Sequence, residues 1–245
     1  MTSREQAAGR GRVYVALGDS ISIDQYAGGP GRGGASLLVR NLDDDFPEWR
    51  GRDLASTGDV RFHLLASDGA TCRTVLDHQL PRLAALGFTP TIVTLTIGGN
   101  DLLAAYGHTA LAQAVIAHVA EAVHEMLEVL QRLMPPAGCV VLGTVYDPSD
   151  GTGDSAQLGL PAWPEGVEVL EQLNRMLVTV SADHGALVAD IHQRFLGHGI
   201  LAGDPSQSKA RPRQRALWYC NLIEPNAWGA SAVRGAFWEA LQQSY

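Results

Sequence analysis

The residues with the clearest chemical potential lie where an apolar run stops. Residues 13–17 are VYVAL, and Gly18, Asp19 and Ser20 follow directly. An apolar run that ends in glycine, a carboxylate and a hydroxyl is typical of a buried strand that reaches the rim of an open α/β sheet, where ligands bind. A serine at this rim can act as a nucleophile if a base and oxyanion donors surround it, or it can cap the next helix.

Two further predicted strands end in polar residues. Residues 60–66, VRFHLLA, are followed by a turn that contains Gly69, and residues 91–97, TIVTLTI, are followed by Gly98-Gly99-Asn100-Asp101. Parallel strands end at the same edge of a sheet, so these loops can converge on Ser20 and place a backbone N–H and a side-chain amide beside its hydroxyl. The alternatives are an ordinary turn at Gly69 and a helix cap at Asn100.

The remaining elements alternate between strand and helix patterns. Apolar residues recur at helical spacing over residues 111–133, and residues 36–42, 165–184 and a closing segment after Pro225-Asn226 also read as helices. Residues 139–145 and 186–191 supply a fourth and a fifth strand. This alternation predicts an α/β fold with one parallel sheet, helices on both of its faces and right-handed crossovers.

Length and charge bound the class of protein. We expect residues 12–245 to form one domain behind a flexible tail at residues 1–11, since α/β chains of this size commonly do. The formal net charge of −8 disfavours nucleic acid as a partner. No segment approaches the length of a membrane span, and the three cysteines have no metal-ligand spacing, so we expect a cytoplasmic protein without metal or cofactor.

Together, the three strand ends carry a family resemblance. Gly18-Asp19-Ser20, Gly69 and Gly99-Asn100-Asp101 resemble, in order and spacing, the first three sequence blocks of the SGNH (GDSL) hydrolases. The resemblance implies a three-layer, flavodoxin-like fold with a five-stranded sheet of order 2-1-3-4-5. It also implies that Ser20 is the nucleophile and that the N–H of Ser20, the N–H of Gly69 and the side chain of Asn100 form an oxyanion hole.

The fourth block of that family is altered in this chain. The family has an aspartate and, three residues later, a histidine, usually followed by Pro-Asn and a glycine. Here Asn221 stands at the aspartate position and Glu224 at the histidine position, while Pro225-Asn226 and Gly229 keep the frame. The resemblance therefore implies an atypical triad.

Three hypotheses follow for the base. Glu224 can serve if burial raises its pKa from the ordinary value near ~4.3. His198, or less favourably His192, can take over from the loop after the fifth strand. In the third hypothesis the pocket remains without catalysis. We therefore predict a serine esterase or acyl hydrolase acting on a small ester or acylated substrate, with a catalytically impaired protein that binds an acyl or glycosyl ligand as the alternative.

Overall fold

The computed structural model describes residues 11–154, 156 and 159–243. Its centre is a five-stranded, all-parallel sheet of order β2-β1-β3-β4-β5, which confirms the predicted fold class and strand order. The strands are β1 (Arg12–Gly18), β2 (Val60–Leu64), β3 (Ile92–Thr96), β4 (Cys139–Gly143) and β5 (Leu187–Ala189). The predicted tail at residues 1–11 lies outside the described residues except for Gly11.

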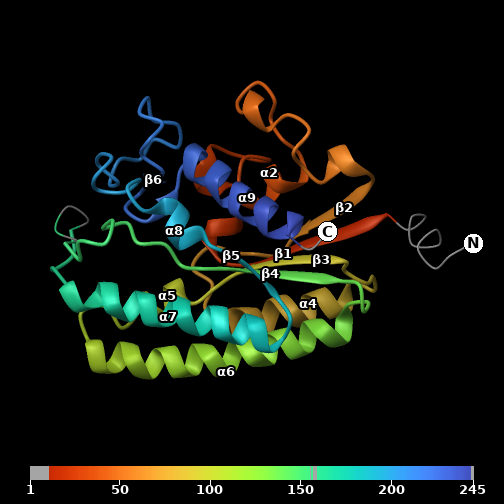
Figure 1. The fold of residues 1–245 in the computed structure, drawn as a ribbon, viewed down its shortest axis with the longest axis horizontal. Helices are drawn as coiled ribbons and strands as arrows, with labels where there is room; N and C mark the ends of the chain where they lie inside the picture. Colours follow the sequence, from red (N-terminus) through yellow and green to blue (C-terminus); the bar gives the residue numbers. More distant parts are fainter. Residues whose placement is uncertain (1–10, 155, 157–158, 244–245) are drawn as a thin grey trace, which may run out of the picture.

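Helices cover both faces of the sheet, which gives three layers (Figure 1). One face carries α2 (Gly34–Val39), α8 (Ile191–Phe195) and α9 (Ala227–Gln242). The other carries α4 (Leu80–Ala85), α5 (Gly99–Leu103), α6 (Thr109–Leu133) and α7 (Pro164–Asp183). Before α4 the chain forms a short helix, α3 (Cys72–Thr74), and a π-helical turn, η5 (Val75–Gln79).

The alternation of side chains along β1 divides the core in two. Val15 and Leu17 pack in the cluster that includes α6 and α7, whereas Tyr14 and Ala16 pack in the cluster that includes α9. All four side chains are fully buried, as expected for a central strand with helices on both faces. Because both faces of β1 are buried, its sequence is a continuous apolar run without alternating polar residues.

The predicted strands after β1 are all present but shorter than expected. They lose residues at their carboxyl ends because these residues leave the sheet to form loops above it. Val145, for example, was expected in β4, but its N–H donates to Asn174 Oδ1 of α7 at 2.7 Å. Beyond the main sheet, β6 (Tyr219–Cys220) and β7 (Glu224–Pro225) form an antiparallel hairpin that was not predicted.

Candidate active site

Ser20 is positioned by a sharp exit from β1. Gly18 has φ +110°, and a Cβ there would lie 1.9 Å from the carbonyl oxygen of Thr96, so only glycine fits. The buried side chain of Gln79 donates to the carbonyl of Gly18 and accepts from its N–H, which fixes this exit. Asp19 then caps a 3-10 helix, η1 (Ser20–Ser22), by accepting from the N–H of Ile21 at 3.2 Å. Ser20 is thus the first helical residue, whose N–H has no partner within the helix.

Glu224 lies against Ser20. β7, which carries Glu224, packs against η1, which carries Ser20. The Ser20 hydroxyl favours the ionised form of the Glu224 carboxyl, and both residues are buried, at 8% and 9% exposure. The second carboxylate oxygen, Oε2, has no hydrogen-bond partner among the described residues. Burial raises the pKa of Glu224 to about 7, and the nearby charge of Asp68 raises it further against the lowering effect of the Ser20 hydrogen bond. A carboxylate with a pKa near neutrality is suited to general-base chemistry.

The β6–β7 hairpin holds Glu224 in this place. Asn226, directly after β7, donates to the carbonyls of Leu217 and Tyr219 and accepts from two N–H groups of the first turn of α9. This buried side chain locks the hairpin to the start of the last helix. Asn221 lies at the exposed tip of the hairpin with φ +48°, and its N–H donates to the carbonyl of Gln207. No hydrogen bond joins it to Glu224 among the described residues.

Asp19 adds a second buried carboxyl beside the pair. Burial raises the pKa of Asp19 to about 7, while hydrogen bonds with Thr96 and with the N–H of Ile21 lower it and the charge of Glu224 raises it. Two carboxyls that interact in this way release their protons in coupled steps. The charge of Glu224 therefore disfavours ionisation of Asp19.

The loops after β2 and β3 meet beside Ser20. The side-chain amide of Asn100 donates to the carbonyl of Ala70 at 3.0 Å, and Asp101 accepts from the N–H of Cys72 with both carboxylate oxygens. These bonds tie the start of α5 to the turn that contains Gly69. Gly69 is exposed with φ +66°, and its N–H has no acceptor among the described residues. Asn100 has one amide hydrogen left for a ligand, because an amide nitrogen carries two.

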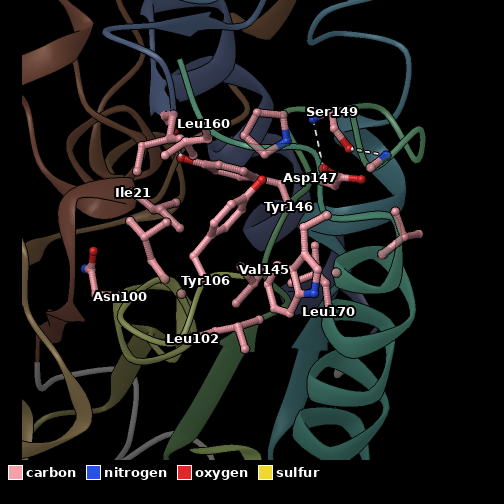
Figure 2. Close-up of a pocket in the computed structure, with 18 of the residues that line it drawn as sticks. Ile21, Asn100, Leu102, Tyr106, Val145, Tyr146, Asp147, Ser149, Leu160 and Leu170 are labelled. Carbon is pink, nitrogen blue, oxygen red and sulfur yellow. Dashed lines mark hydrogen bonds between the residues drawn. The ribbon is translucent and has the colours of Figure 1, made fainter. Parts of the chain in front are cut away.

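A largely apolar pocket opens from this point (Figure 2). Ser20 and Asn100 both line it, so the structure brings these two predicted residues together. Its other walls come from α5, α7, the segment between α5 and α6, and the loop after β4. The apolar lining includes Leu102, Tyr106, Val145, Leu160, Trp163 and Leu170.

The sequence of the chain is similar to one established family over most of its length. Residues 16–230 match the GDSL-like lipase/acylhydrolase family. The chain belongs to this family. A lipase from Streptomyces rimosus is 27% identical over 211 residues, which span 78% of this chain and 74% of that protein.

Solved structures show the same fold at lower identity. Axe2, an acetylxylan esterase from Geobacillus stearothermophilus, superposes with a TM-score of 0.64 at 17% identity, over 96% of this chain and 95% of Axe2. LAE5, an alpha/beta hydrolase enzyme from the metagenome of Lake Arreo, has a TM-score of 0.59 at 19% identity, over 96% of this chain and 97% of LAE5. These likenesses establish that the GDSL-like chain has the fold of its structural neighbours.

The histidines considered as alternative bases are held elsewhere in this GDSL-like chain. His198 stacks on Trp218 with ring centroids 3.4 Å apart, and its Nδ1 lies 2.7 Å from the carbonyl oxygen of Ala216. His192 has its Nδ1 3.0 Å from the carbonyl oxygen of Val145. Among the described residues, neither ring hydrogen-bonds to Ser20, and none of His192, His198 and Glu224 lines the pocket itself. Of the three candidate bases, Glu224 is the one whose pKa the Ser20 hydroxyl shifts.

Sequence reasoning missed two features of the GDSL-like site. One is Asp19, which was taken only as part of a motif, although a carboxylate next to a buried strand end is a candidate for a raised pKa. The other is the apolar wall formed by Leu102, Tyr106, Trp163 and Leu170, whose residues are far apart in sequence and read as ordinary core positions. No local pattern distinguishes a pocket wall from a core.

Asp150 connects the loop after β4, which lines the pocket, to residues 197–201 of the same chain. Its carboxylate accepts hydrogen bonds from the N–H groups of Gly197, Gly199 and Leu201, at 2.9 to 3.0 Å. We expect Asp150→Ala to lower the free energy of unfolding by about 2 kcal/mol, since charge-assisted hydrogen bonds are lost. Urea denaturation measures this change. Asp150→Asn keeps one acceptor and should lose less; equal stability of the alanine variant and the wild type would contradict the role.

Proposed function

We propose that the protein is a serine esterase or acyl hydrolase that acts on a small ester or acylated substrate, with Ser20 as nucleophile and Glu224 as general base. The observation that carries the proposal is the buried Glu224 carboxyl beside Ser20, whose hydroxyl favours the ionised form of that carboxyl, while Glu224 Oε2 has no hydrogen-bond partner among the described residues. A serine hydroxyl attacks an ester only when a base receives its proton. Glu224 is the described residue in position to do so.

The reaction follows two balanced steps. Ser20 Oγ attacks the acyl carbonyl carbon while its proton passes to Glu224, and the resulting tetrahedral intermediate collapses as Glu224 protonates the leaving alcohol oxygen. Water then attacks the acyl-serine, gives its proton to Glu224, and the acid leaves as Ser20 recovers that proton. In both steps the negative oxygen of the intermediate is held by the N–H groups of Ser20 and Gly69 and by the Asn100 amide.

We expect Asn100→Ala to lower kcat by ~10²–10³-fold, because it removes a donor that acts mainly on the transition state. Hydrolysis of an aryl ester measures the loss, and thermal unfolding reports whether the contact with Ala70 matters for the fold. Asn100→Asp is the matched variant: it keeps the size of the side chain but replaces the donor with an acceptor. Full activity in Asn100→Asp would reject the oxyanion role.

One observation favours the alternative, a protein that binds an acyl or glycosyl ligand without turnover. Within the part of the chain that the structure describes, Asn221 forms no hydrogen bond with Glu224 and Glu224 Oε2 has no hydrogen-bond partner, so no described side chain orients the base as an aspartate orients a catalytic histidine. Solved catalytic mutants of Axe2 carry alanine in place of a serine in one case and of a histidine in the other. The test is whether the wild type hydrolyses any ester faster than Ser20→Ala.

We also propose that the protein resides in the cytoplasm. The support is that all three cysteines, Cys72, Cys139 and Cys220, are free, as is usual for proteins kept in a reducing compartment. None of the helices among the described residues could span a bilayer. Fractionation of cells that express the tagged chain tests the location.

A further inference from the structure

The walls of the pocket beyond Ser20 present carbon atoms almost throughout. Tyr106 and Trp163 pack edge to face, with ring centroids 5.1 Å apart. The Tyr106 hydroxyl donates to the carbonyl of Pro161 at 2.6 Å, and the Trp163 indole N–H donates to Thr109 Oγ1 at 3.1 Å. Both polar atoms are therefore occupied outside the cavity, and the aromatic rings offer a ligand apolar surface.

Away from Ser20 and Asn100, the polar side chains Asp147 and Ser149 of the lining already accept hydrogen bonds. Asp147 accepts from the N–H groups of Ser149 and Gly151, and Ser149 Oγ accepts from the N–H of Gly153. Figure 2 shows the hydrogen bond from the Ser149 N–H to Asp147 and the one that Ser149 Oγ accepts. Among the described residues, the lining contains no Lys, Arg or His. The described lining therefore offers no cationic side chain to compensate a carboxylate or a phosphate for the water that it loses.

The size of the pocket sets the length of an apolar ligand. The cavity holds about 150 Å³. An apolar cavity of about 150 Å³ engineered into another protein binds benzene, a six-carbon molecule. An acetyl group has only one methyl beyond its carbonyl carbon and would leave most of this space empty.

The pocket also has a direction. In Figure 2 Asn100 lies at one side of the cavity, and Leu170, on α7, lies at the other. With the ester carbonyl held beside Ser20 and Asn100, the acyl chain extends from the catalytic end toward Leu170. The alcohol part of the ester then lies outside the apolar pocket.

We propose that this pocket selects esters of uncharged, unbranched acyl chains of medium length, about four to eight carbons, over acetyl esters. This inference rests on the proposed function, because it assigns the pocket to the acyl group of the substrate that Ser20 attacks. It separates this chain from its structural neighbour Axe2, which is named as an acetylxylan esterase. The specificity arises from the wall formed by Tyr106, Trp163, Val167 and Leu170.

The first test is a series of aryl esters that share one alcohol and differ only in the acyl chain, from two to ten carbons. Each buried methylene contributes ~0.8 kcal/mol, so kcat/KM should rise about fourfold per added methylene up to about six carbons, and then level off or fall. Equal or declining kcat/KM from acetyl onward would overturn the inference while leaving the esterase function intact.

Filling the pocket is the second test. Leu170→Trp should reduce kcat/KM for the hexanoyl ester at least tenfold and leave the acetyl ester within about twofold of wild type, since about two lost methylene contacts, at about fourfold each, are worth that much. Val178→Trp is the matched control, because Val178 lies on the same helix but is 45% exposed. A Leu170→Trp protein that hydrolyses the hexanoyl ester at the wild-type rate would contradict the assignment.

A binding measurement keeps the inference testable if turnover is absent. Ser20→Ala protein is titrated with hexanamide and with acetamide, two uncharged mimics of the acyl group, while tryptophan fluorescence reports on Trp163. Hexanamide has four more carbons than acetamide, so at about fourfold per methylene it should bind about 250-fold more tightly. Equal affinities would overturn the acyl pocket. Tight binding of hexanamide in a protein without esterase activity would instead reject the proposed function and retain the pocket.

Discussion

Ser20→Ala should lower kcat/KM for the best aryl ester by at least ~10⁴-fold. A covalent acyl-serine requires the Ser20 oxygen. In Ser20→Ala only the oxyanion donors and the pocket remain, and they can assist only the direct attack of water on the ester. Removal of a catalytic serine in a serine hydrolase is among the largest single-residue effects known, at ~10⁶-fold in one protease. The measurement is steady-state hydrolysis combined with active-site titration of the enzyme, so that traces of wild type are counted.

Ser22 provides a matched control within the same 3-10 helix. It is fully buried, and its hydroxyl hydrogen-bonds to Thr96 Oγ1 at 3.0 Å rather than facing Glu224. Ser22→Ala should lower the free energy of unfolding by ~1 kcal/mol and leave kcat/KM within a few fold. If Ser20→Ala and wild type hydrolyse every ester of the series at the same rate, the chain is a binding protein and the nucleophile assignment is wrong.

The fold followed from the sequence because its signals are local. β1 and β3 lie between helices on both faces, so their apolar runs are uninterrupted, and the turns that end them require glycine. The long helix α6 shows the spacing of an amphipathic helix over residues 109–133, close to the predicted 111–133. Patterns of this kind depend on neighbours three or four residues away and need no knowledge of tertiary contacts.

Only part of the candidate site could be predicted from the sequence, because its other properties depend on contacts between residues that are far apart in the chain. Ser20 in η1 and Asn100 in α5 follow the ends of the adjacent strands β1 and β3, so a topology argument places them together. The partner of Ser20 is set instead by a hairpin of two-residue strands, held by Asn226, that no periodicity reveals. The pKa of Glu224 depends on its burial, which is a property of the whole fold.

Glu224→Gln is expected to lower kcat/KM by ~10³-fold, because a positioned general base contributes ~10²–10⁴-fold and glutamine does not accept the serine proton. The substitution preserves the size of the side chain and an oxygen that can accept from Ser20. Turnover unchanged in Glu224→Gln would exclude Glu224 as the base. His198→Ala is the parallel variant, and a loss confined to His198→Ala would show that a histidine acts despite its stacking on Trp218.

The pH profile tests the same assignment without a substitution. The base acts in its ionised form, and burial raises the pKa of Glu224 to about 7. The kcat/KM of the wild type should therefore be constant above about pH 8 and fall about tenfold per pH unit below pH 7. Asp19 has a pKa raised to about 7 as well, and its charge is coupled to Glu224. In Asp19→Asn the fall of kcat/KM with decreasing pH should remain but begin at a lower pH. If kcat/KM no longer falls in Asp19→Asn, the titrating group is Asp19.

Stability should change in the opposite sense to activity. The pKa of Glu224 is about 7 in the folded chain and near its ordinary value of 4.5 when unfolded. The folded state thus holds the proton more tightly, and the free energy of unfolding falls as pH rises from about 4.5 through about 7. Glu224→Gln lacks this loss, so at pH 8 it should be more stable than wild type by up to about 3 kcal/mol, with no such gain below pH 4. If Glu224→Gln is inactive and more stable than wild type only at high pH, Glu224 is a carboxylate that is buried for its function. If Glu224→Gln is inactive and less stable at every pH, Glu224 has a structural role.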